Sequence, residues 1–189
     1  MICEKTKLAL EKLFPAPPPE EEIVPEETED VEAETETEVE AEAKDKKPKK
    51  EEPEPRQNGV IDVDYSKHGY HLDAQVDPDQ LLEAIGIIDE HEFFIESITG
   101  VDWIKENQLE VVYDFSRYDF DTCRVVVRTR VDRDNPEVPT ITGIYAGANW
   151  HERETHEFFG IKFAGHPHLI PLLLPEDADF HPLLKDFKA

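Results

Sequence analysis

The sequence contains few residues of several kinds that specialised proteins need. Its 189 residues include two cysteines, one methionine and two tryptophans. No apolar run approaches the roughly 20 residues needed to span a bilayer. Cys3 and Cys123 form no CxxC pair and lie far apart in the chain. We therefore expect two ordinary thiols in a reducing compartment, no thiolate metal site and no membrane-spanning segment.

Basic residues are also scarce. Lys and Arg number 20 against 45 Asp and Glu, which gives a formal net charge of −25, and positions 20–42 contain no basic residue. Such a charge repels nucleic acid and anionic lipid, so both are excluded as direct partners. Residues 1–14 mix Lys and Glu with Leu and lack the apolar core of a signal peptide. These features predict a protein on the cytoplasmic side.

Glycine-rich binding loops are missing from the sequence. Gly143, Gly147 and Gly160 do not have the spacing of a phosphate-binding loop or a dinucleotide fingerprint. We also find no nucleophile elbow of the kind that hydrolases carry. The sequence therefore offers no familiar nucleotide-binding or nucleophilic site.

The composition changes sharply near Asn58 and Gly59. Before this point, residues 15–55 are almost entirely Pro, Glu, Ala, Thr and Lys, which cannot bury enough apolar surface to offset the entropy of ordering. We therefore predict a disordered acidic tail over residues 1–58 and a folded domain over residues 59–189. Residues 1–14 have the apolar spacing of a short helix, but an isolated segment of this length is expected to fray.

Periodicity within residues 59–189 predicts an α+β fold. Asp77-Pro78 favours a helix start, and residues 109–115 and 123–131 alternate apolar and polar side chains as half-buried strands do. Residues 93–103 predict a further strand, with Gly100 at a turn or bulge. We expect an antiparallel or mixed sheet with flanking helices, packed on one face and carrying arginines on the other.

The last third of the chain is predicted to be a helix followed by an extended segment. Turn residues at 134–139 precede a region, residues 140–160, that we predict to be helical, with Gly160 as its C-terminal stop. The residues that follow are rich in proline and apolar side chains. They are expected to run extended over the surface of the domain.

The helical region contains residues that suggest metal binding. His151-Glu152 with His156 is similar to an HExxH motif, but a spacing of five turns the two histidines roughly 140° apart on a helix. Glu154 and Glu157 share a face, as carboxylates do in di-iron bundles, but the sequence offers no second such pair. We therefore predict charged residues at an interface rather than a metal site.

Acid–base catalysis is a second possibility. An isolated enzyme could use Glu154, Glu157 and His166 as a carboxylate–histidine site. Proline, however, follows His166 and His181 and stiffens both segments. Rigid connectors with hydrogen-bonded histidines are therefore the preferred interpretation.

Recognition of a partner explains the motif best. Arg153 and Glu157 are spaced to form an ion pair along the helix, and Trp150, Phe158 and Phe159 supply apolar anchors. If a partner covers such charges, they lose water and must be matched across the contact. We therefore predict a docking surface on this helix.

Five runs near the end of the sequence form one long, irregular motif. They are Ala148-Asn149-Trp150-His151-Glu152-Arg153-Glu154, Glu157-Phe158-Phe159-Gly160-Ile161, Phe163-Ala164-Gly165-His166-Pro167, Leu172-Leu173-Leu174-Pro175 and His181-Pro182-Leu183-Leu184-Lys185-Asp186-Phe187. This motif resembles the 30 kDa subunit family of NADH:quinone oxidoreductase, respiratory complex I, and its relatives in energy-converting hydrogenases and deazaflavin-dependent dehydrogenases. The resemblance covers residues 77–187 and excludes the acidic tail. Two departures, Ile170-Pro171 and Leu184, remove cations that members of the family often have.

The resemblance implies a non-catalytic structural subunit of a peripheral arm at the cytoplasmic face of the membrane. It implies no cofactor on this chain, with iron–sulfur clusters and a flavin or nickel–iron centre on partner subunits. The expected partners are a hydrogenase-like large subunit and the iron–sulfur subunits of the same complex. The expected interface residues are Trp150, Glu152, Arg153, Glu154, Glu157, Phe158, His166, His181, Lys185 and Asp186.

Two functional alternatives stay open. One is the equivalent subunit of an energy-converting hydrogenase or a deazaflavin-dependent dehydrogenase, because the electron donor binds elsewhere in all of these complexes. The other is a stand-alone acidic binding module whose tail engages basic partners.

Overall fold

The computed structural model of the protein describes residues 2–14, 57–119 and 122–188. The predicted disorder of residues 15–55 falls outside these ranges. The described residues belong to one compact unit. Within these ranges, no helix combines the length and the apolar character needed to cross a bilayer.

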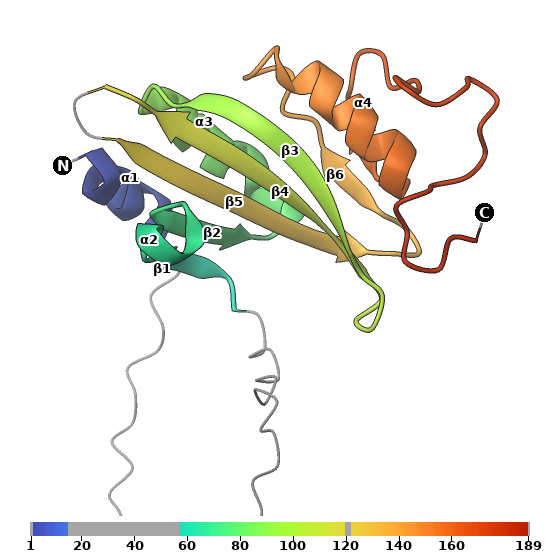
Figure 1. The fold of residues 1–189 in the computed structure, drawn as a ribbon. Helices are drawn as coiled ribbons and strands as arrows, with labels where there is room; N and C mark the ends of the chain where they lie inside the picture. Colours follow the sequence, from blue (N-terminus) through green and yellow to red (C-terminus); the bar gives the residue numbers. More distant parts are fainter. Residues whose placement is uncertain (1, 15–56, 120–121, 189) are drawn as a thin grey trace, which may run out of the picture. The chain divides into compact units, whose positions relative to one another are not determined.

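A five-stranded mixed sheet organises this unit (Figure 1). Strands β3, β4 and β5 form an antiparallel meander, β2 pairs with β5 in parallel, and β1 pairs with β2 in antiparallel, in the order β1-β2-β5-β4-β3. The strands are β1 (Gly59–Asp62), β2 (Leu72–Val76), β3 (Phe94–Trp103), β4 (Gln108–Arg117) and β5 (Cys123–Asp132). The predicted α+β class with a mixed sheet is confirmed. Strand β1 was not predicted because it is short, and β2 was overlooked although its apolar and polar residues alternate.

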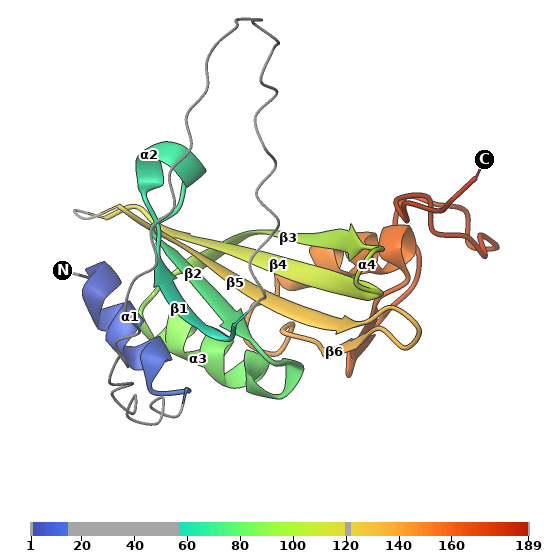
Figure 2. The ribbon, with the colours of Figure 1, turned by 90° about the horizontal axis from the view of Figure 1, so that it is seen from below.

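Helices α1 and α3 lie against one face of the sheet, and α2 lies on the opposite side (Figure 2). The helix start predicted at Asp77-Pro78 is that of the 3-10 turn η1, around which Asp77 and Gln80 form a capping box, and α3 continues from this turn at Leu81. A small parallel pair, β6 with β7, accompanies α4. The elements are α1 (Ile2–Glu11), α2 (Tyr65–His68), the 3-10 turn η1 (Pro78–Gln80), α3 (Leu81–Glu90), β6 (Glu137–Pro139), α4 (Ala148–Phe159) and β7 (Lys162–Ala164).

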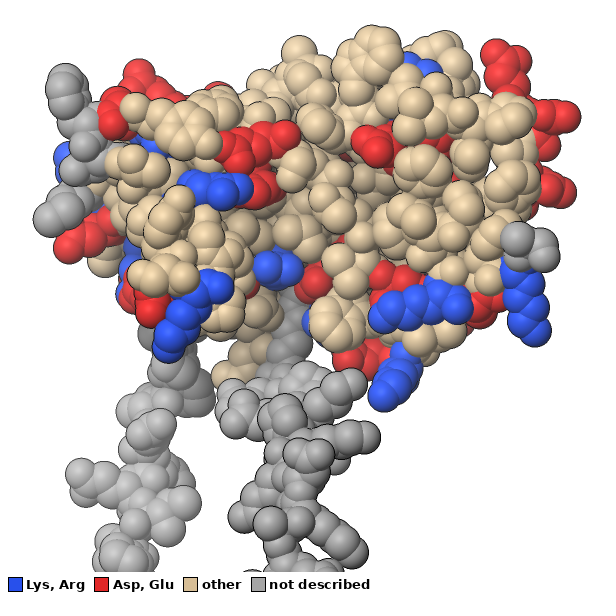
Figure 3. Space-filling model, in the orientation of Figure 1, with Lys and Arg blue, Asp and Glu red and all other residues tan. Residues whose placement is uncertain are grey.

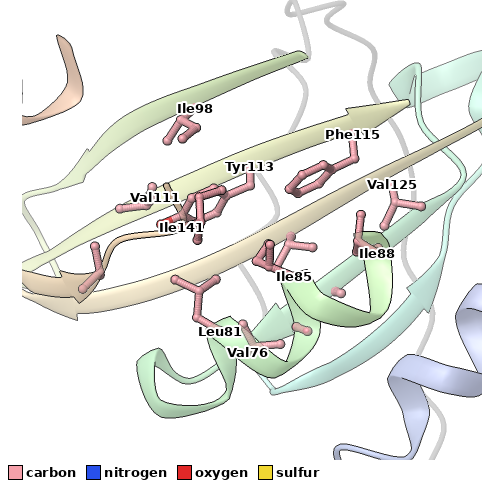
Figure 4. Packing of buried hydrophobic residues seen from close by; sticks show 14 of the residues in the cluster. Val76, Leu81, Ile85, Ile88, Ile98, Val111, Tyr113, Phe115, Val125 and Ile141 are labelled. Atoms are coloured by element: carbon pink, nitrogen blue, oxygen red, sulfur yellow. The ribbon is translucent and has the colours of Figure 1, made fainter. Parts of the chain in front are cut away.

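The core lies between the sheet and α3 (Figure 4). Tyr113 and Phe115 project from β4 toward Ile85 and Ile88 of α3, and all four side chains are fully buried. The predicted alternation of β4 and β5 is confirmed, because the residues at the apolar positions of both strands face this core. A full set of buried aliphatic and aromatic side chains is the main source of stability for a domain of this size.

The opposite face of the sheet carries the predicted arginines. Arg124 contacts Asp114 at 2.6 Å, Arg128 contacts Asp73 at 3.0 Å, and Arg130 contacts Glu110 at 3.0 Å. These pairs form a ladder across neighbouring strands. The arginines therefore neutralise carboxylates of their own sheet and do not form a separate basic surface.

Two local predictions near the docking helix were wrong. Gly100 lies inside β3 in regular register, and the irregularity of this strand falls between Ile95 and Ser97. Residues 140–147 form turns, so α4 begins at Ala148, eight residues later than the predicted helix start. The stop at Gly160 is confirmed, since its φ of 77° is left-handed and its N–H bonds to the carbonyl of His156 at 2.8 Å.

The expectations for residues 1–14 and for the cysteines also differ from the structure. Helix α1 docks on the domain itself, with Leu10 fully buried and Gln80 donating to the carbonyl of Leu13 at 3.0 Å. Cys3 of α1 forms a disulfide with Cys123 of β5, with 5.9 Å between their Cα atoms. The prediction of two separate thiols was wrong because the fold brings together residues 120 positions apart.

Candidate docking surface

Helix α4 packs along β3, the edge strand of the sheet (Figure 1). Its side toward the domain carries polar residues as well as Ala148, because Glu152, Thr155 and Glu157 are all buried. The Thr155 hydroxyl donates to the carbonyl of Ile98 in β3 at 3.3 Å. Polar anchors of this kind fix the position of a helix more narrowly than apolar packing alone.

Glu152 connects α4 to the turn that follows β6. Its carboxylate accepts the N–H of Ile141 at 2.8 Å and the hydroxyl of Thr140. Burial raises the pKa of Glu152 to about 7, although the two hydrogen bonds oppose this shift. His166 lies 3.9 Å away, and burial lowers the pKa of its ring. Both shifts favour uncharged forms of this pair.

The raised pKa of Glu152 makes stability depend on pH. Between the ordinary value of 4.5 and about 7, the folded protein keeps a proton that the unfolded chain releases, so stability falls as pH rises through this window. The full shift corresponds to about 3 kcal/mol. We expect the free energy of unfolding of the wild type, relative to Glu152→Gln, to fall between pH 5 and pH 8, as measured by urea unfolding.

Two features make that comparison specific. Both proteins keep His166, whose pKa shifts in the opposite direction, so the difference reports Glu152 together with its coupling to His166. Glu154→Gln, at an exposed position of the same helix, is the matched control and should show no such pH dependence. A difference between wild type and Glu152→Gln that stays constant across this range would contradict the assignment.

Glu157 holds the segment that follows α4 and β7. Its two carboxylate oxygens accept the backbone N–H groups of Leu172, Leu173 and Leu174 at 2.8–3.0 Å. The His181 ring donates from Nδ1 to the carbonyl of Glu157 at 2.8 Å. One position on α4 thus fixes two points of the C-terminal segment.

Arg153 also binds this segment. Its Nε donates to the carbonyl of Ile170 and its Nη2 to the carbonyl of Pro171, both at 2.9 Å. The predicted Arg153–Glu157 ion pair is therefore replaced by contacts to the following chain. Helical spacing placed Arg153 and Glu157 near each other. It could not predict that each binds backbone groups of the irregular segment after the helix.

The histidines of the two His-Pro pairs are hydrogen-bonded, as the preferred interpretation expected. His166 donates to the carbonyl of Asn149 at 3.3 Å, and His181 donates to that of Glu157 at 2.8 Å. His156, for which no such prediction was made, donates to the carbonyl of Ile161 at 2.8 Å. The alternative site of Glu154, Glu157 and His166 is not assembled. Glu157 faces residues 172–174, His166 faces Glu152 and Asn149, and Glu154 is exposed.

Asp102 and Arg133 form an anchor that the site prediction missed. Asp102 is buried at the end of β3, where it pairs with Arg133 at 3.1 Å and accepts the N–H of Lys185 at 2.8 Å. Arg133 also donates from Nη1 to Oδ2 of Asp186 at 3.1 Å. The available signal was an acidic residue at an inward position of β3, in phase with Ile98, because a buried charge requires a partner.

Held in this way, residues 165–188 present apolar side chains outward. Leu173 is 66% exposed, and Trp150 on α4 is 61% exposed with Arg153 over its ring at 5.5 Å. The other exposed apolar side chains of this segment are Ile170, Phe180, Leu183 and Phe187. Figure 3 shows broad areas without charge between clusters of acidic and basic side chains. Exposed apolar groups gathered on one segment are typical of an interaction site.

The predicted interface residues separate into three groups. Glu152 and Glu157 lie inside the chain, so they support the surface but cannot touch a partner directly. Arg153, Phe158 and His181 are half-buried, whereas the side chain of His166 is fully buried beside Glu152. The residues that are open to contact are Trp150, Glu154, Lys185 and Asp186. The accessible docking surface therefore consists of the outer side of α4 and the outward side chains of residues 165–188.

Comparison with known proteins adds an independent finding. Residues 74–189 match the family described as respiratory-chain NADH dehydrogenase, 30 Kd subunit. One relative, a subunit of the NADH-quinone oxidoreductase of Roseiflexus sp. (strain RS-1), is 47% identical over 94 residues, which cover 49% of this chain and 53% of that protein.

Two further matches come from other complexes. One is a subunit of the F(420)H(2) dehydrogenase of Methanosarcina mazei, which is 42% identical over 94 residues, 49% of this chain and 59% of that protein. The other is a chain of the archaeal membrane-bound sulfane sulfur reductase, with a TM-score of 0.56 at 32% identity, covering 62% of this chain and 71% of that one. The matches thus span little more than half the length of the Roseiflexus and Methanosarcina proteins.

Proposed function

This chain belongs to the family of the respiratory-chain NADH dehydrogenase 30 kDa subunit, and from that membership we propose that it is a non-catalytic structural subunit of the peripheral arm of a membrane-bound, ion-translocating oxidoreductase. Its partners are the hydrogenase-like large subunit and the iron–sulfur subunits of the same complex. The redox centres lie on those partners. The same partners hold the chain at the cytoplasmic face of the membrane.

The observation that carries this proposal is the outward set of apolar side chains on residues 165–188. This segment contains no helix or strand, yet Arg153, Glu157 and Asp102 hold it by hydrogen bonds to its backbone. An apolar segment fixed in an exposed position is prepared for contact, because little conformational entropy is lost when a partner binds. Leu173 and Trp150 are the most exposed anchors.

Rigid support suits a subunit that positions electron carriers. Electron transfer between neighbouring clusters depends steeply on distance, so a subunit that touches several partners must hold them without slack. The five-stranded sheet with its fully buried core supplies that rigidity. Arg153 and Glu157 of α4 fix the docking surface to this rigid sheet by their hydrogen bonds to residues 170–174.

Under this proposal, the chain could belong to either of two complexes that oxidise different electron donors. Relatives are named for NADH-quinone oxidoreductase and for F(420)H(2) dehydrogenase. The proposed docking role is the same in both. Affinity purification of the tagged chain from its own cells, with identification of the co-purifying subunits and the donor that the assembly oxidises, distinguishes them.

Substitution of Leu173 by Asp tests the docking surface. We expect the yield of co-purifying subunits to fall at least 10-fold, because a carboxylate placed in a covered apolar contact would be desolvated without a partner. The isolated chain should unfold at the same urea concentration as the wild type, since Leu173 is exposed in the free protein.

Leu8→Asp is the matched control. Leu8 is 61% exposed on α1, so the same chemical change is made at similar exposure away from the proposed surface. We expect normal recovery of partners with this variant. Recovery of partners by Leu173→Asp at the wild-type level would contradict the proposed docking surface.

A further inference from the structure

Three potentially reactive side chains meet at one end of the sheet. Cys3 comes from α1, His71 precedes β2, and Cys123 is the first residue of β5. The two sulfurs and one ring nitrogen of His71 lie within 4.8 Å of one another. The sulfurs are joined as a disulfide. The docking surface described above does not include this cluster.

The two sulfurs differ in accessibility. Cys123 is fully buried, whereas Cys3 is half-buried on the outer layer formed by α1. From this difference we infer that a molecule from solution reaches Cys3 before Cys123. This asymmetry is the arrangement of an attacking thiol with a resolving thiol behind it.

The surroundings of Cys3 favour a negatively charged sulfur in the reduced protein. Cys3 is the second residue of the ten-residue helix α1, where free backbone N–H groups stabilise negative charge. The imidazole of His71 is close to both sulfurs and stacks on Tyr65, with 4.6 Å between ring centroids. A helix N-terminus is a setting that raises the thiolate fraction of a cysteine.

The same ring argues against a metal as the natural occupant. Nδ1 of His71 accepts the backbone N–H of Arg124 at 3.1 Å, so the hydrogen of the neutral ring is on Nε2. A neutral imidazole has one such lone pair, and here it is already engaged. The cluster therefore suits thiol chemistry better than ligation of a cation.

We propose that Cys3 and Cys123 are a redox-active pair that undergoes thiol–disulfide exchange with low-molecular-weight disulfides of the glutathione class. In the forward direction the Cys3 thiolate attacks one sulfur of the small disulfide, whose S–S bond breaks and releases one small thiol. The Cys123 sulfur then loses its proton and attacks Cys3, which releases the second small thiol. Two protein thiols become one disulfide, and the small disulfide is reduced to two thiols.

The consequence of exchange falls on α1. The disulfide ties this helix to β5, and its non-covalent contacts include the buried Leu10, the Gln80 bond to Leu13 and an ion pair of Lys7 with Asp62. Thr6 is also buried, and Ile2, Leu13 and Phe14 pack against the core, so the reduced helix stays docked but without a covalent tether. Reduction therefore loosens α1 and leaves the core of the sheet intact.

Single variants of the full chain test the assigned roles. In Cys123→Ala, Cys3 should form a mixed disulfide with glutathione that persists, seen by mass spectrometry as one added glutathionyl group. In Cys3→Ser, Cys123 should react with oxidised glutathione at least 10-fold more slowly. Equal rates at the two positions would overturn the proposal, as would failure of the reduced wild type to form the internal disulfide.

Two measurements on the wild type do not depend on variants. Brief alkylation of the reduced chain should modify Cys3 before Cys123, and amide hydrogen exchange within Ile2–Glu11 should be faster in the reduced than in the oxidised chain. Equal exchange in the two states would overturn the tethering of α1. Zinc added to the reduced chain should not protect the thiols, and stoichiometric protection by zinc would assign the cluster to a metal and overturn the exchange reaction.

Discussion

Replacement of Glu157 by alanine should release the C-terminal segment from α4. The variant loses the acceptor for the N–H groups of Leu172, Leu173 and Leu174. Hydrogen bonds to a charged group contribute about 1.5–3 kcal/mol each, but the freed N–H groups regain water, so we expect a local loss of about 3 kcal/mol. Amide exchange at residues 172–174 should become on the order of 100-fold faster.

Two variants control this experiment. Glu154→Ala removes an exposed carboxylate from the same helix and should leave amide exchange at residues 172–174 unchanged. Glu157→Gln keeps one carbonyl acceptor and should give an intermediate rate. Because the segment presents Leu173, Glu157→Ala should also lower the recovery of partner subunits. Unchanged protection of these amides in Glu157→Ala would show that apolar packing, not the carboxylate, holds the segment.

Replacement of Gly100 by alanine should destabilise the whole domain. A Cβ atom at this position of β3 would lie 2.4 Å from Cδ2 of Phe159, with two more atoms of that ring within 2.8 Å. The ring of Phe159 must then shift, and α4 with it. Overpacking of this kind costs about 1–3 kcal/mol and occasionally more. We expect a loss near the upper end of that range in urea unfolding, because the clash is with a ring at the helix–strand contact.

Gly86→Ala is the matched control for this prediction. Gly86 lies in α3, and a Cβ there meets no atom within 4 Å, so helix propensity should stabilise the protein by up to about 1 kcal/mol. The two Gly→Ala substitutions should change the free energy of unfolding in opposite directions. This difference attributes the loss in Gly100→Ala to the clash with Phe159. Phe159→Ala combined with Gly100→Ala should cost less than the sum of the two single changes, since the clash requires both groups. Strict additivity would rule out the contact as the cause.

Local patterns in the sequence determined much of the sheet and α3. Mostly apolar residues at every second position of 109–115 and 123–131 identified β4 and β5, because only one face of the sheet packs on a helix. Asp77-Pro78 and Gly160 marked one helix start and one helix end correctly, because caps and left-handed stops depend on a few neighbouring residues. Strands β1, β6 and β7 are too short to leave such a period, whereas Leu72, Ala74 and Val76 of β2 do alternate with polar residues over five positions.

Tertiary structure alone decided how the docking residues act. The sequence grouped Arg153 and Glu157 by helical spacing, but both bind backbone groups of residues 170–174, whose placement no periodicity records. It also marked Gly100 as a turn or bulge, whereas the residue makes room for Phe159 of α4. In each case the determining partner is distant in the chain.

The two cysteines are the clearest case of a contact between distant residues that the sequence did not predict. Their spacing of 120 residues gave no reason to pair them, and the pairing follows only from α1 docking beside the start of β5. By itself, the sequence determined the acidic charge, the family resemblance, the α+β class and the strands with a strong period, because these depend on composition and on neighbouring residues. The fold decided which charged groups are buried, which apolar groups are presented and which sulfurs meet, because those properties arise from contacts between distant segments.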